Sequence, residues 1–145
     1  MPLTVEDESV RSYISFIQGV ITRMATNSAS CKTWCVTIIS ALTVLALDHD
    51  KPNALSVAFL PLGLFFLLDA YYLSLERDFI TLQNAFVKKL HADTAVATDV
   101  FDFKPASGFG HRVGSLISAV FSVSILPFYG ILIAALIITR RKLAG

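Results

Sequence analysis

Two charged residues stand alone inside long uncharged stretches of this sequence. Lys32 is the only charged residue of segment 27–47, and Asp69 is the only charged residue of segment 54–75. A charge in apolar surroundings is costly unless it is paired, so each residue needs a partner or a route to water. In an antiparallel hairpin that turns at residues 48–53, Lys32 and Asp69 lie at the same depth, and we expect an ion pair.

The same register brings Glu76 close to Arg23, so we expect a second charge pair there. The indole N–H of Trp34 is a candidate third member of the Lys32–Asp69 pair. Asp69 then serves either as a gate or ion-binding residue, or as a structural clasp between the two segments. We favour the clasp, because a paired charge near a membrane interface is a common packing device.

Hydroxyl side chains follow one face of the first apolar segment and one face of the last. They are Thr33, Thr37 and Ser40 in the first, and Ser115, Ser118 and Ser122 in the last. Small hydroxyl residues let helices approach closely, and this packing role is the one we favour. The alternative is that copies of one segment line a pore, and both roles coexist if an oligomer is the functional unit.

A set of basic residues offers a candidate site for an anionic ligand. These residues are Arg77, Lys88, Lys89, Lys104 and Arg112. Acidic residues balance them within segment 76–112, so a solvated surface near lipid headgroups is the favoured interpretation. The alternative is a site around an oligomer axis, where symmetry multiplies each basic residue.

Catalytic and metal-binding patterns find almost no support. Cys31 and Cys35 share a helix face, but no histidine or third cysteine lies nearby, which disfavours a metal site. No nucleophile–base arrangement and no glycine-rich phosphate loop are recognisable in the sequence. We therefore expect no enzymatic activity, no cofactor and no metal.

The composition indicates the solvent in which these residues must be held. Of the 145 residues, 54% are hydrophobic and only 16% are charged, whereas soluble domains carry about 25% charged residues. The net charge of +1 and the two cysteines indicate neither a nucleic-acid-binding protein nor a disulfide scaffold. The fold class that we predict is an all-α integral membrane protein.

Hydropathy divides the chain into five expected parts. They are an N-terminal amphipathic helix (1–26), a transmembrane helical hairpin (27–75), a cytoplasmic juxtamembrane helix and loop (76–112), a third transmembrane helix (113–139) and a basic tail (140–145). Each apolar part has about the 20 residues that a span needs. The first helix lies on the membrane surface or plugs a pore, with Ile14, Ile17 and Ile21 as a candidate gate.

The positive-inside rule favours a cytoplasmic N-terminus. With three spans, eight basic residues fall inside and four outside, and the outer four include the Arg140–Lys142 cluster. That cluster conflicts with the rule. A re-entrant last segment would remove the conflict, at the cost of non-helical backbone in the membrane.

Several short strings match a widespread group of small bacterial multi-span proteins. They are Arg23-Met24-Ala25, Asn27-Ser28, Lys32 and Trp34, then Leu68-Asp69-Ala70-Tyr71-Tyr72-Leu73 with Glu76-Arg77, and finally Phe128-Tyr129. Ile80 and Gln83 depart from the pattern, where an arginine and a tyrosine are usual. The chain thus resembles the small membrane effectors of bacterial anti-phage modules that accompany nucleotidyltransferases, Hailong-type modules among them.

This resemblance implies a homo-oligomeric channel in the bacterial inner membrane, with a tetramer as the working number. It also implies a nucleotide or oligonucleotide signal from a partner nucleotidyltransferase, and depolarisation of the membrane in defence against phage. The alternative is a non-conducting membrane scaffold or sensor subunit, which recruits a soluble partner through residues 76–112.

Overall fold

The computed structural model describes residues 3–4, 6–48, 52–101 and 109–144. All regular secondary structure in these ranges is helical. The elements are α1 (Glu8–Asp48), η1 (Pro52–Ala58), α2 (Phe59–His91), η2 (Ala97–Asp99), α3 (Phe109–Val120) and α4 (Leu126–Ala144). The predicted all-α fold is confirmed.

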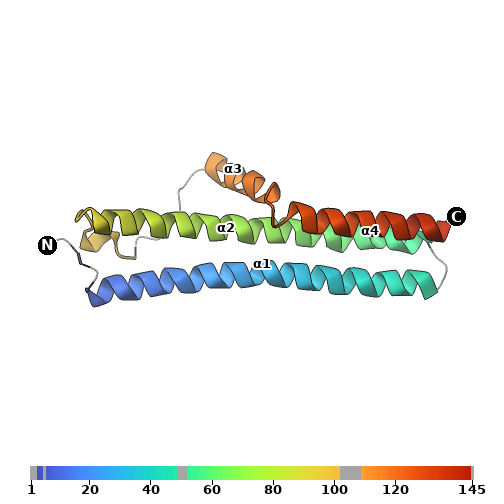
Figure 1. Ribbon diagram of the computed structural model, residues 1–145, viewed down its shortest axis with the longest axis horizontal. Helices are drawn as coiled ribbons and strands as arrows, with labels where there is room; N and C mark the ends of the chain where they lie inside the picture. Colours follow the sequence, from blue (N-terminus) through green and yellow to red (C-terminus); the bar gives the residue numbers. More distant parts are fainter. Residues whose placement is uncertain (1–2, 5, 49–51, 102–108, 145) are drawn as a thin grey trace.

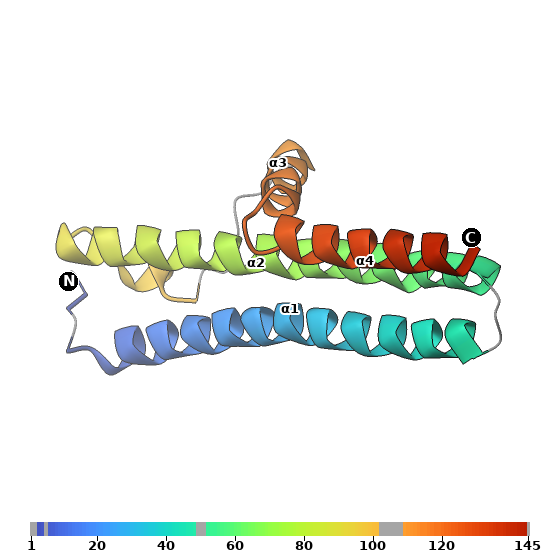
Figure 2. The ribbon, with the colours of Figure 1, turned by 45° about the vertical axis from the view of Figure 1, so that its right-hand side comes forward.

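The helices α1 and α2 form a long antiparallel hairpin, and α4 lies along the end of the hairpin where α1 and α2 connect (Figures 1 and 2). The 41 residues of α1 extend for about 62 Å, twice the roughly 30 Å of a bilayer's hydrocarbon core. The boundary expected at residue 26 is not structural, because α1 passes through it without a break. The N-terminal amphipathic segment therefore does not lie across the axis of segment 27–47, as a surface helix would.

Two separate hydrophobic clusters divide the hairpin along its length. We call residues 27–75 together with α4 the apolar half, and residues 8–26 together with 76–101 the stalk. In the stalk, the Tyr13 ring packs edge-on against Phe86, with ring centroids 4.7 Å apart. The cluster of the apolar half is formed by all three of its helices and η1. Each half thus has a core of its own.

Two helical segments, Glu8–Asp48 and Leu55–His91, are long and apolar enough to cross a membrane. Only 22% and 28% of their most apolar windows are buried. A core helix of a water-soluble protein is mostly buried, so these helices leave unusually much apolar surface uncovered. Leu60 and Leu64, for example, are 79% and 57% exposed.

The last apolar segment differs from our expectation of one helix over 113–139. It forms two helices, α3 and α4, which are separated by residues 121–125. Pro127 accounts for the break, because its ring would clash with the carbonyl group of residue 123 in a continuous helix. At the second position of α4, in contrast, a proline costs no hydrogen bond.

The chain ends beside the connection between α1 and α2, at the opposite end of the molecule from the N-terminus (Figure 1). The helix α4 runs along the whole apolar half and does not turn back. Arg140–Lys142 lie at the connection end of the hairpin, as the three-span arrangement expects.

Candidate functional site

A fully buried carboxylate joins the two long helices in the apolar half. Asp69 of α2 has 0% of its surface exposed. Its Oδ1 accepts a short hydrogen bond from the Ser28 hydroxyl of α1. Its Oδ2 lies 2.6 Å from Nζ of Lys32, also of α1. The ion pair expected between Lys32 and Asp69 is present in the structure.

The spacing of residues in α1 explains how two donors meet one acid. Ser28 and Lys32 are four residues apart, so they lie one above the other on the same helix face. Lys32 Nζ donates a hydrogen bond to Ser28 Oγ at 3.2 Å, and its side chain keeps 19% of its surface exposed. The hydroxyl therefore bridges the ammonium and Oδ1, whereas Oδ2 is held by the ion pair and has no hydrogen bond of good geometry within the described residues. No role was predicted for Ser28 here, although its spacing from Lys32 could have revealed one.

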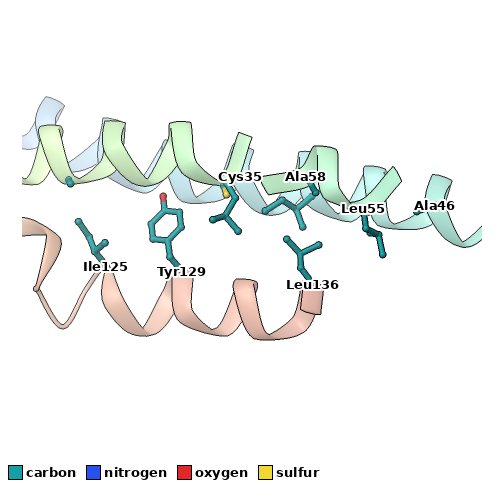
Figure 3. Packing of buried hydrophobic residues seen from close by; sticks show 10 residues of the cluster. Cys35, Ala46, Leu55, Ala58, Ile125, Tyr129 and Leu136 are labelled. Carbon is teal, nitrogen blue, oxygen red and sulfur yellow. The ribbon is translucent and has the colours of Figure 1, made fainter. Parts of the chain in front are cut away.

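The helix α4 brings a further polar group to this level of the bundle. Tyr129 is 2% exposed, and its hydroxyl points from α4 toward α1 and α2 (Figure 3). The rings of Phe66 and Phe128 pack edge-on against it, with centroids 5.3 and 5.0 Å away. Within the described residues the hydroxyl has no hydrogen-bond partner, although the Asp69 carboxylate is near enough to act on it electrostatically.

The second charge pair that we expected, Arg23 with Glu76, does not form among the described residues. The two residues have the predicted depth, but Arg23 precedes Lys32 by nine positions, which is a rotation of about 180° around α1. Arg23 is therefore exposed on the far side of the helix from α2. Trp34 is likewise 59% exposed and is not part of the Asp69 group, because it follows Lys32 by about 200°.

The hydroxyl face of α1 is not covered by any of the residues that the structure describes. Thr33 and Thr37 are exposed, and their hydroxyls donate to backbone carbonyls one turn earlier, at 3.2 and 2.9 Å. Ser40 lines an open groove of about 310 Å³ between α1 and α4, together with Thr43 and Thr139. This face is available to a neighbour or to water, and each threonine hydroxyl is already satisfied by its own helix.

The serines of the last segment face α2. Ser115 Oγ accepts from Ser74 at 3.0 Å and donates to Asp78 Oδ1 at 3.1 Å. Arg77 Nη1 donates to the carbonyl and the hydroxyl of Ser118, at 3.2 and 3.3 Å. Ser115 and Ser118 therefore dock α3 on α2 through polar contacts. Ser122 is buried beside the helix break and has no hydrogen-bond partner within the described residues.

The four basic residues that the structure describes do not gather into one site. Arg77 is bound to Ser118, and Lys89 Nζ pairs with Asp99 Oδ1 at 2.7 Å. Lys88 and Arg112 are exposed, and Arg77 lies about 17 Å along α2 from Lys88. Lys104 lies outside the described residues.

The ion pair of Lys89 and Asp99 in the stalk lowers the pKa of Asp99. The hydrogen bonds that Asp99 accepts from the Lys89 ammonium and the Val96 backbone N–H hold its pKa below the ordinary value. This ion pair links the end of α2 to the segment after it.

The isoleucines proposed as a gate are part of the stalk core. Ile17 is 0% exposed, and Ile14 and Ile21 pack against the same cluster, which includes Phe86 and Leu90 of α2. A plug needs this apolar face free, whereas here it is used to hold α1 against α2. Cys31 and Cys35 are buried free thiols on α1.

Comparisons with protein-family models, with curated proteins and with solved structures find no match to this chain.

Proposed function

We propose that this chain is an integral membrane protein whose apolar half crosses a bacterial inner membrane, with the N-terminus and the stalk in the cytoplasm. The observation that carries the proposal is the ion pair of Lys32 with the fully buried Asp69, set among apolar helices that are mostly uncovered. In water such helices would expose large apolar patches. In lipid the same apolar surface contacts the acyl chains, and the charges of Lys32 and Asp69 neutralise each other inside the bundle.

Within the membrane we propose that several copies assemble into an ion channel, a tetramer being the working number. Two features support assembly. The hydroxyl face of α1 and the groove beside it are uncovered in the single chain, and small hydroxyl residues favour contacts between helices in lipid. Control by a nucleotide or oligonucleotide, and a role in anti-phage defence, rest on the family resemblance.

A second candidate is a non-conducting scaffold or sensor subunit that binds a soluble partner. The stalk favours this alternative, because it extends well beyond the length needed to cross a bilayer. It also has its own hydrophobic core, in which Tyr13 packs against Phe86. A rigid two-helix projection of this kind is a suitable docking element.

Ion flux from liposomes separates the two candidates. Purified protein is reconstituted with a trapped potassium dye, and flux is recorded with and without nucleotides and short oligonucleotides. The channel proposal predicts flux that depends on one of these additions and changes in Asp69→Asn, whereas Glu76→Gln behaves as the native chain. Absence of flux in every condition would refute the channel and leave the scaffold.

A further inference from the structure

The helix α3 differs from the other helices in its direction and in the way it presents its faces. Both views show it leaving the long axis that α1, α2 and α4 share (Figures 1 and 2). It docks through the hydrogen bonds of Ser115 and Ser118 to α2 and through Leu116 and Val120, which pack against the core of the apolar half. The side of α3 away from these contacts is turned outward.

That outward face is apolar. Val113 and Ile117 of α3 and Phe121, the residue directly after it, are four residues apart and lie on one side, opposite Ser115. They are 39%, 53% and 71% exposed. Nothing within the described residues covers this stripe, and in water its exposure would be unfavourable.

The stripe lies at a defined level of the molecule. The α2 residues that hold α3 are Ser74, Arg77 and Asp78. They stand where the apolar stretch 54–75, whose only charge is Asp69, ends and charged residues become frequent, which is the expected level of the lipid headgroups. Arg112 is exposed at the start of α3, and no carboxylate among the described residues pairs with it or with Arg77.

We infer that α3 is an interfacial helix whose Val113–Ile117–Phe121 stripe enters the acyl–headgroup boundary of an anionic phospholipid leaflet. The inference rests on the proposed membrane insertion of the apolar half. Arg77 and Arg112 supply the charge that complements lipid phosphates, and the oblique direction of α3 suits a helix lying in the plane of the leaflet. Docked on α2, α3 fixes the depth at which the hairpin sits.

Depth-dependent quenching of a fluorophore tests this inference. An NBD label is placed on Ile117→Cys, on Ser12→Cys in the exposed stalk, or on Leu64→Cys in the apolar half, and each protein is reconstituted in phosphatidylcholine–phosphatidylglycerol vesicles. The native chain, whose cysteines are 7% and 0% exposed, is the blank for labelling. We expect the Ile117 label to be quenched by lipids that carry a nitroxide near the headgroup. Lipids that carry it near the chain end should quench the Leu64 label, and Ser12 should remain unquenched.

The outcomes distinguish this inference from the proposal on which it rests. Quenching at Leu64 without quenching at Ile117 would overturn the interfacial helix alone, whether water or a second copy of the chain covers the stripe. No quenching at either position would overturn membrane insertion itself. Arg112→Gln should weaken quenching at Ile117 in anionic vesicles and leave it unchanged in pure phosphatidylcholine, and equal loss in both lipids would contradict the role of charge.

Discussion

Removing Lys32 alone should cost far more stability than removing both charges of the Lys32–Asp69 pair. We consider Lys32→Met, Asp69→Asn and the double variant. In Lys32→Met the carboxylate loses its counter-charge, while it remains fully buried beside Ser28. Breaking a buried ion pair in this way costs about 3–5 kcal/mol of unfolding free energy.

The reverse substitution should be milder. Asp69→Asn keeps a group of the same shape that still accepts from Ser28, and it leaves Lys32, whose side chain is 19% exposed, a route to water. We expect a loss of about 1–3 kcal/mol, the cost of an unpaired buried polar group. In the Lys32→Met background the same Asp69→Asn change removes an uncompensated charge. There it should raise stability, so the effect of one substitution changes sign with the background.

The free energy of unfolding in detergent, followed by circular dichroism and by the fluorescence of the single tryptophan, measures this cycle. The matched control is the cycle of Arg23→Met and Glu76→Gln, which has the same charges on the same two helices without an ion pair. Its coupling energy should stay below about 0.5 kcal/mol. Additive effects in the Lys32–Asp69 cycle, or equal coupling in both cycles, would refute the reasoning.

Further predictions concern the stalk and the α4 contact. Phe86→Ala should lower stability by about 3–5 kcal/mol in denaturant unfolding, because Phe86 is 4% exposed and packs against Tyr13. Gly19→Ala should raise it by about 0.5–1 kcal/mol, since no atom lies within 4 Å of the added Cβ; a loss would reveal an unseen neighbour. Tyr129→Phe should change stability by less than about 1 kcal/mol, because the buried hydroxyl lies near the Asp69 carboxylate without a hydrogen bond of good geometry; a clear loss would show that the hydroxyl is bonded. The pKa of Asp99 is lower in the folded protein than in the unfolded chain, so its ionised carboxylate stabilises the fold. This contribution to the melting temperature is fully present above the unfolded-state pKa, and it is lost as the pH falls through the folded-state pKa. Asp99→Asn should flatten that pH dependence, and an unchanged profile would contradict it.

The sequence predicted the hairpin and its register, because both follow from hydropathy. Only one short polar stretch separates the two apolar segments, so an antiparallel hairpin followed, with Lys32 and Asp69 at the same depth. The depth of a residue does not say on which side of its helix the residue lies. Depth alone paired Arg23 with Glu76, whereas helical phase places Arg23 on the opposite face from Lys32.

The break between α3 and α4 could not be located from hydropathy. Residues 113–139 are uniformly uncharged, so no polar boundary marks residues 121–125. Pro127 was the only residue that indicated a break. A proline in an apolar helix either kinks the helix or ends it, and the packing around it decides which of the two occurs. Here the hydrogen bonds of Ser115 and Ser118 hold α3 against α2 and away from the path of α4.

The central claim, that the hairpin crosses a membrane, is tested most directly by the sidedness of its two ends. Asp48→Cys lies at the connection between α1 and α2, and Lys88→Cys lies in the stalk, both at exposed positions. A membrane-impermeant maleimide applied to intact bacterial spheroplasts should label Asp48→Cys and leave Lys88→Cys unlabelled until the membrane is lysed. Labelling of both positions, or of neither, before lysis would contradict the account.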